Sequence, residues 1–212
     1  MIVLAIDTTQ GACSAAVMDG CVILASLSEP MQRGHQERLA PLVAETMTAA
    51  GLGFGELDRI GVTVGPGSFT GLRVGLAFAK GLALALDIPC VGIGALEALA
   101  ASDPGQELTA AVIDAGRGQI YLQLFDAGVA RGAPEVAAFD DAPQRIRRLA
   151  GDGPLTLLGS AAALAERMPG ARFVLLTAPD PVAIARLAAA APAPAAPPQP
   201  LYLRAPDARL PA

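Results

Sequence analysis

The sequence predicts an α/β fold that contains two copies of one unit, and three observations support this prediction. Short runs rich in β-branched residues alternate with helical patterns along the chain. A strand that ends in aspartate, followed by a turn of small residues and a second strand, occurs at the N-terminus and again from residue 108. Such a repeat indicates duplication of one α/β unit. The length of 212 residues fits a pair of modest domains.

The first copy is expected to open with three strands and to continue with alternating helices and strands. Strands are expected at residues 2–6, 13–18, 22–27, 59–64 and 88–93. Residues 35–50 carry apolar side chains at helical spacing, and Gly51 follows as a C-cap. A second helix should begin at a cap formed by Ser68 or Thr70 and run to about Leu86.

The second copy repeats the strand, turn and strand of the first and again alternates helices with strands. Strands are expected at residues 110–113, 120–125, 155–158 and 173–175, and helices at residues 143–150, 161–167 and 181–191. Residues 192–200 are rich in Ala and Pro and should form an extended linker. The segment 201–204 is apolar enough to dock back on the body.

The composition indicates a folded protein, and the charge argues against a protein that binds nucleic acid unaided. Apolar residues make up 53% and charged residues 17% of the sequence, which is typical of a folded protein with a substantial core. The net charge is -5. Binding to a nucleic-acid backbone depends on clustered Lys and Arg, so we expect any nucleic acid to be held mainly by a partner.

The sequence favours a cytoplasmic protein with reduced thiols. Cys13, Cys21 and Cys90 are odd in number and lack C-x-x-C spacing, which argues against a disulfide framework and a zinc knuckle. The first apolar run has no basic residues before it and is interrupted by Asp7, so a signal peptide is not expected. The longest apolar stretch is shorter than a membrane span and contains Lys80, so no membrane association is expected.

The turn Asp7-Thr8-Thr9 follows the first strand. A carboxylate at a strand end, beside turn amides and hydroxyls, would suit a phosphate or a hydrated Mg²⁺. The alternative is a hairpin turn in which Asp7 makes local hydrogen bonds, and the residues alone favour that alternative.

A glycine-rich segment, residues 65–73, lies between a strand and a helix. Free amides at a helix N-terminus can receive an anion. A P-loop would need Gly-Lys-Ser/Thr at its end, and a nucleophile elbow would need glycines where Pro66 and Thr70 stand. Ser68 is therefore expected to cap the helix rather than to act as a nucleophile.

The second helix has two contrasting faces. Gly71, Gly75 and Ala79 form a stripe of small residues that should lie on the sheet. At 100° per residue, the charged face gathers Phe69, Arg73, Leu76, Ala77, Lys80 and Leu84. Large apolar and charged groups together indicate a subunit contact, unless the Arg and Lys stems cover the chain's own core. The first helix is expected to flank this face with Gln36, Ala40, Ala44 and Met47.

Other polar residues give weaker signals. His35 is the only histidine, so no two-histidine metal site can form within one chain, and a surface or N-cap position is expected for it. Asp114 repeats the position of Asp7 in the second copy. Arg117 in the same turn either serves as part of a ligand site or pairs with Asp114.

Three segments carry a resemblance to a known family. They are Ile6-Asp7-Thr8-Thr9, Gly65-Pro66-Gly67-Ser68-Phe69-Thr70-Gly71-Leu72-Arg73-Val74-Gly75 and Tyr202-Leu203-Arg204. Together they resemble the TsaB (YeaZ) family of bacterial tRNA-modification proteins, most closely over residues 1 to about 125. The resemblance implies the actin/hexokinase-like (ASKHA) architecture of two RNase H-like domains with mixed sheets flanked by helices. It places one domain at residues 1–99 with a docked tail at 198–212, and a smaller one at 100–197.

The resemblance also implies a role without catalysis. Such proteins are scaffold and activator subunits that pair with the catalytic paralogue TsaD and the ATPase TsaE. The complex transfers threonylcarbamoyl to an adenosine of tRNA next to the anticodon. A heterodimer with TsaD, a homodimer when alone, and tRNA contact only through the complex are expected. No cofactor is required, while weak ATP or ADP binding at the complex interface, with Asp7, Thr8 and Thr9 as a vestigial nucleotide loop, is left open.

The catalytic paralogues carry a His-x-x-x-His metal pair on the segment that matches residues 94–99. This chain has Ala95 and Leu99 there, so the resemblance implies no metal-dependent transfer or peptidase reaction. The alternative is a stand-alone enzyme of the same fold, either a sugar-kinase-like phosphotransferase or a glycoprotease-type peptidase. A kinase would need two intact phosphate loops, but Arg117 lies in the second, and a peptidase would have only His35 as base.

Overall fold

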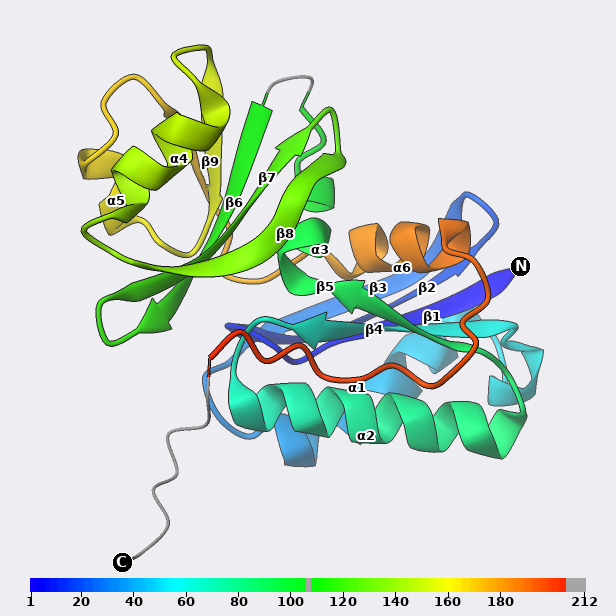
Figure 1. Cartoon of the computed structure of the whole chain (residues 1–212). Coiled ribbons are helices and arrows are strands. Elements are labelled where there is room, and N and C mark those ends of the chain that lie inside the picture. The colour runs from blue at the N-terminus through cyan, green and yellow to red at the C-terminus, as the bar shows by residue number, and fades with distance from the viewer. Residues whose placement is uncertain (106–107, 205–212) are drawn as a thin grey trace, which may run out of the picture.

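The computed structural model describes residues 1–105 and 108–204, which form two α/β units (Figure 1). The strands of the first unit are β1 (Ile2–Asp7), β2 (Ala12–Asp19), β3 (Val22–Pro30), β4 (Arg59–Gly65) and β5 (Cys90–Gly94). Those of the second are β6 (Leu108–Gly116), β7 (Gln119–Asp126), β8 (Val129–Ala138), β9 (Leu155–Gly159) and β10 (Arg172–Leu175). The helices are α1 (His35–Ala50), α2 (Phe69–Leu86), α3 (Ala95–Ser102), α4 (Ala142–Ala150), α5 (Ala163–Glu166) and α6 (Pro181–Ala190), with a 3₁₀ turn at Phe54–Glu56.

The two sheets have the same topology. The first has the order β3-β2-β1-β4-β5, and the second, read from its opposite edge, has the order β8-β7-β6-β9-β10. In each, the first three strands in the sequence are antiparallel neighbours and the last two run parallel to the first. The predicted repeat of one α/β unit is confirmed, and so is the expected fold of two mixed sheets flanked by helices.

The first sheet is covered on both faces because its strands alternate apolar side chains between them. Leu4 and Ile6 of β1 pack with residues of α1 and α2. Val3 and Ala5 face the other way, toward α6. In Figure 1, α1 and α2 accordingly lie on one side of this sheet, and α3 and α6 on the other. This arrangement places α1 and α2 side by side on an outer face of the molecule.

The second sheet is covered by shorter helices on one face. Ile146 of α4 and Leu164 of α5 are buried with apolar residues of β6, β7 and β9. On the opposite face, Leu96 and Leu99 of α3 pack with Ile113 and Phe125. Helix α3 therefore lies at the junction of the two units.

Helix α6 falls within the range expected for the second domain, yet it packs on the first sheet. A Cβ atom added at Gly61 of β4 would lie 2.5 Å from the Ala188 Cβ atom, so the helix and strand are in close contact. Arg59 donates hydrogen bonds to the carbonyl oxygens of Ala188 and Ala191, at 2.7 and 2.6 Å, and so caps the C-terminus of α6. The domain boundaries given above remain a prediction. Judged by its packing, α6 belongs with the first sheet.

The C-terminal segment crosses the surface between the two units. The Leu201 amide donates to the Val64 carbonyl oxygen at 2.7 Å, and the Arg204 guanidinium donates to the Ala115 carbonyl oxygen at 2.8 Å. In Figure 1 this part of the chain is drawn in red and runs along the side of α2. The remainder of the expected docked tail, residues 205–212, lies outside the described residues.

Several elements differ from the sequence-based expectation. The helix expected at residues 161–167 is reduced to the four residues of α5. Helix α3 has only eight residues, too few for a clear periodic pattern. Strand β8 contains Gly132 and Pro134, which normally argue against a strand, but it lies at the edge of its sheet, where proline is tolerated.

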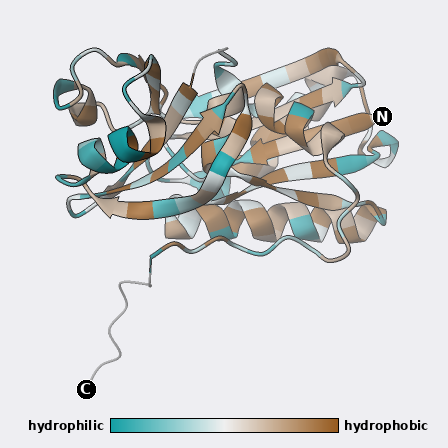
Figure 2. Cartoon of the chain, turned by 45° about the horizontal axis from the view of Figure 1, so that its top comes forward, coloured by the Kyte–Doolittle hydropathy of each residue, from teal (hydrophilic) through white to brown (hydrophobic). Residues whose placement is uncertain are grey.

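Helix α2 is the one helix in the described part of the chain that is long and apolar enough to cross a membrane by length and composition. Figure 2 shows it as mostly hydrophobic along its length. In this fold α2 instead lies along the first sheet, where Leu72, Leu76 and Ala79 are buried.

Candidate functional site

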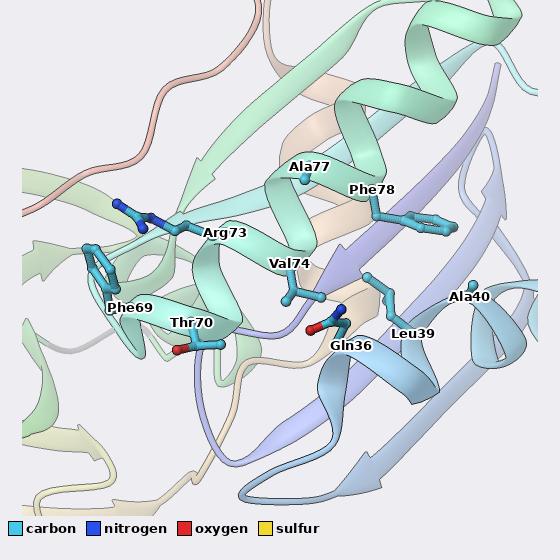
Figure 3. A pocket seen from close by; sticks show the side chains of 9 residues that line it. All are labelled: Gln36, Leu39, Ala40, Phe69, Thr70, Arg73, Val74, Ala77 and Phe78. Atoms are coloured by element: carbon cyan, nitrogen blue, oxygen red, sulfur yellow. The ribbon is translucent and has the colours of Figure 1, made fainter.

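A groove lies between α1 and α2 on the outer face of the first unit (Figure 3). It encloses about 520 Å³. Its lining is mainly apolar and contains no carboxylate; it consists of Gln36, Leu39, Ala40, Phe69, Thr70, Arg73, Val74, Ala77 and Phe78. In Figure 3 Leu39 of α1 and Phe78 of α2 extend into the space between the helices, with Ala40 and Ala77 at its sides.

The small residues of α2 determine which face of the helix is exposed. The Thr8 hydroxyl donates to the Gly71 carbonyl oxygen at 2.7 Å, and a Cβ atom at Gly75 would lie 2.5 Å from the Thr8 Oγ1 atom. The two glycines therefore rest against the turn after β1, whereas the sequence predicted contact with the sheet, and Ala79 of the same stripe is buried in the core of the first sheet. Ser68 caps the helix, since its hydroxyl accepts from the Gly71 amide. The opposite side of α2 is left open to solvent.

The structure separates the expected interface residues into three groups. Gln36, Ala40, Ala44, Phe69, Arg73, Ala77 and Leu84 are exposed, and Lys80 is half-buried. Leu76 is 5% exposed and Met47 is 2% exposed, and both belong to the core between the helices and the first sheet. The structure thus contradicts the placing of Leu76 on the exposed face of α2 and of Met47 beside it on α1. Both side chains point into the core. A substitution such as Leu76→Glu would therefore test the stability of the fold and not an interface.

The residues at the far end of α2 line a different groove. Lys80 and Leu84 face the Ala/Pro-rich segment, at Pro194 and at residues 195–197, around a second cavity of about 590 Å³. Leu84 is 85% exposed. The face predicted as one continuous surface is therefore divided between two grooves, and only its N-terminal half borders α1.

One contact at the groove was not predicted. Tyr202 of the C-terminal segment lies with its ring centroid 5.3 Å from that of Phe69. The Arg73 Nε atom donates to the Tyr202 hydroxyl at 3.2 Å, and the Arg73 guanidinium carbon lies 3.8 Å from the centroid of the Phe69 ring. The apolar character of residues 201–204 predicted docking, but a residue pattern cannot show which helix a distant segment reaches.

The turn Asp7-Thr8-Thr9 is used for internal contacts. One Asp7 carboxylate oxygen accepts from the Thr9 amide at 3.0 Å, the Thr9 hydroxyl at 2.6 Å and the Thr63 hydroxyl at 2.5 Å. Burial raises the pKa of Asp7, although these hydrogen bonds act in the opposite direction. The Thr8 hydroxyl is bound to α2. These side chains are poor ligands for a phosphate, and nucleotide binding by them stays a prediction.

A polar cleft of about 570 Å³ lies between the two units. Its lining includes Gln10, His35, Ser68, Asp114 and Arg204. The Asp114 carboxylate accepts from the Gly116 amide at 2.7 Å, so it closes its own turn. The His35 side chain is buried at the start of α1, rather than exposed at the surface, and its Nε2 atom has no hydrogen-bond partner within residues 1–105 and 108–204.

The two positions that the family resemblance relates to a histidine pair are buried in α3. Ala95 and Leu99 lie in the apolar cluster at the junction of the two units. No group of three or more His, Cys, Asp or Glu side chains in the described ranges could hold a metal ion.

A comparison with protein families identifies one match over most of the chain. Residues 27–178 match the family described as TsaD, tRNA N6-adenosine threonylcarbamoyltransferase. The matched region contains α1, α2 and all five strands of the second unit.

Similar curated proteins carry the name TsaB, and similar solved structures carry the name YeaZ. The Escherichia coli tRNA threonylcarbamoyladenosine biosynthesis protein TsaB is 32% identical over 160 residues, which cover 72% of this chain and 69% of that protein. The Bacillus subtilis protein of the same name is 35% identical over 59% of this chain and 55% of its own length. The structure of YeaZ from Pseudomonas aeruginosa aligns with a TM-score of 0.77 and 29% identity, covering 89% of this chain and 90% of that one.

Proposed function

This chain belongs to the TsaB (YeaZ) family, and we propose that it acts in the biosynthesis of tRNA threonylcarbamoyladenosine as a non-catalytic docking subunit. In this proposal it binds the catalytic paralogue TsaD through the groove between α1 and α2. TsaD then carries out the transfer to tRNA, and this chain acts as scaffold and activator.

The groove is the observation that carries the proposal. Phe69 is 39% exposed beside an apolar lining, and Ala40 and Ala77 allow the backbone of a partner helix to approach closely. A pair of adjacent helices with such a face can pack with an equivalent pair by ridges and grooves, forming a four-helix contact. Buried side chains the size of Phe69 each contribute about 1.5 to 3 kcal/mol to such a contact.

The absence of catalysis rests on the sequence at one segment. The metal-binding histidines of the catalytic paralogue correspond here to Ala95 and Leu99, whose side chains cannot ligate a metal. We therefore expect the purified chain neither to transfer threonylcarbamoyl nor to hydrolyse peptides. Turnover by highly purified protein that disappears when a residue of this chain is mutated would refute the scaffold role.

The other partners follow from the same proposal. The ATPase TsaE joins the complex of this chain with TsaD, and tRNA is contacted through that complex. Alone, the chain forms a homodimer through the same groove. We place the protein in the cytoplasm, where tRNA is modified.

The groove can be tested with two alanines of the same helix. Ala77 lines the groove, whereas Ala85 is exposed on α2 and lines none of the three cavities described above. Ala77→Glu should weaken TsaD binding about a hundredfold, because it places an uncompensated carboxylate in the contact. Ala85→Glu should bind like the wild type. Binding is measured by titration calorimetry, with circular dichroism as the folding control, and equal affinity of both variants would refute the docking site.

A further inference from the structure

The side chains of Phe69, Arg73 and Tyr202 form an ordered cluster at one end of the groove. The Arg73 guanidinium lies over the Phe69 ring, and its Nε atom donates to the Tyr202 hydroxyl. Figure 3 shows the Arg73 and Phe69 side chains together at the end of the groove that they help to line, with Thr70 on the same turn of α2. Stacking on an aromatic ring and a hydrogen bond to Nε together restrict a long, otherwise mobile side chain.

Tyr202 is held in place from both sides along the chain. Before it, the Leu201 amide is bound to the Val64 carbonyl oxygen, and after it, the Arg204 guanidinium is bound to the Ala115 carbonyl oxygen. Leu203 packs on the apolar cluster at the junction of the units. The Tyr202 hydroxyl is therefore a fixed acceptor for Arg73, while the residue itself remains 41% exposed.

No carboxylate of the described residues balances the charge of Arg73. Within the described residues, no carboxylate lies within 4.0 Å of its nitrogens, and Nε is its one hydrogen-bonding atom. The two terminal nitrogens of a guanidinium form a fork that fits a carboxylate.

We propose that this cluster, which we call the Arg73 anchor, binds a carboxylate of the protein partner and thereby favours that partner over a second copy of this chain. The inference rests on the proposed docking role of the groove. A second copy offers the same groove lining, which contains no carboxylate and brings another Arg73. A partner helix pair with an aspartate or glutamate at this end pairs with the guanidinium instead. Tyr and Arg are also the residue types most enriched where binding energy concentrates.

The test compares binding to TsaD with self-association in the same variants. Arg73→Gln keeps a long polar side chain but removes the charge. It should weaken TsaD binding about tenfold, and it should leave self-association unchanged or make it stronger. The wild-type complex should weaken as salt is raised, and the variant should lose most of that dependence. Calorimetry measures the hetero-complex and analytical ultracentrifugation the self-association.

A second variant tests the role of Tyr202 as a positioning residue. Tyr202→Phe keeps the ring on Phe69 but removes the acceptor for Arg73. We expect a loss of about threefold in TsaD affinity in the wild-type background and no further loss when combined with Arg73→Gln, because both act through the same guanidinium.

The outcomes separate this inference from the proposed function. If Ala77→Glu abolishes binding while Arg73→Gln and Tyr202→Phe bind TsaD like the wild type, the groove is the docking site and the Arg73 anchor is refuted. Equal losses in hetero-complex and homodimer with Arg73→Gln would also refute it, since the anchor must discriminate between the two. Wild-type binding by all three variants would overturn the docking site itself.

Discussion

The contact between α2 and the turn after β1 leads to a sharp prediction about two glycines in one helix. A Cβ atom at Gly71 would lie 2.0 Å from the Thr8 carbonyl oxygen, whereas nothing lies within 4 Å of one at Gly81. Neither residue is among the glycines with positive φ. Gly71→Ala should therefore destabilise the protein, and Gly81→Ala should stabilise it.

The magnitudes follow from these contacts. An ordinary carbon–oxygen contact is about 3.3 Å, so Gly71→Ala must move α2 away from the turn by more than an ångström. Such overpacking costs roughly 1 to 3 kcal/mol, and the same movement breaks the bond from the Thr8 hydroxyl to Gly71, at roughly another 1 to 3 kcal/mol. Replacing glycine within a helix returns up to about 1 kcal/mol, so we expect a net loss of about 1 to 6 kcal/mol. Gly81→Ala keeps only the gain of up to about 1 kcal/mol.

Urea unfolding, followed by circular dichroism, measures both changes in the free energy of unfolding. Because the movement of α2 would also displace the groove, Gly71→Ala should weaken TsaD binding, whereas Gly81→Ala should not. If Gly71→Ala is as stable as the wild type, α2 does not rest on the turn as described. A loss of stability in Gly81→Ala would show that this position is packed rather than open.

Three further predictions concern charge and chemistry. Since burial raises the pKa of Asp7 above its ordinary value of 3.8, this group favours the folded state most at low pH, and the contribution is lost as pH rises through the folded-state pKa. Asp7→Asn keeps an acceptor oxygen but removes the buried charge. It should raise the free energy of unfolding at neutral pH and reduce the pH dependence of that free energy, as measured by urea titrations. A variant that is less stable than the wild type at neutral pH would contradict this. Burial also raises the pKa of Cys13 and Cys90 to about 11, so a thiol reagent at pH 8 should label exposed Cys21 first and all three only after unfolding, as intact mass would show. Finally, the net charge of -5 predicts weak tRNA binding by the isolated chain at physiological salt, and a submicromolar, salt-sensitive complex in filter binding would oppose it.

Local patterns predicted most of the secondary structure of the first unit. The helix expected at His35–Ala50 is α1 with the same bounds, because apolar spacing and Gly51 determine its extent within the segment itself. The Ser68 cap of α2 is likewise a local feature. Helix α3 was not predicted and α5 is shorter than expected, since four to eight residues carry too little periodicity. Strand β8 owes its conformation to pairing with β7.

The candidate site was predicted only in part. Helical spacing grouped Leu76 with Arg73 and Ala77, but it could not show how far the helix is rotated toward the sheet. That rotation follows from the close approach of Gly71 and Gly75 to Thr8, which turns Leu76 into the core and leaves Ala77 exposed. Met47 is buried for the same kind of reason in α1.

The sequence by itself determined the alternating elements, the duplicated unit and the family, because each depends on spacing and composition along the chain. The tertiary structure alone decided the division of the α2 face between two grooves, the packing of α6 on the first sheet and the contact of Tyr202 with Arg73. These features join residues as far apart as 132 positions in sequence. Their geometry depends on how whole helices, sheets and the C-terminal segment pack, and no short-range pattern encodes those distances.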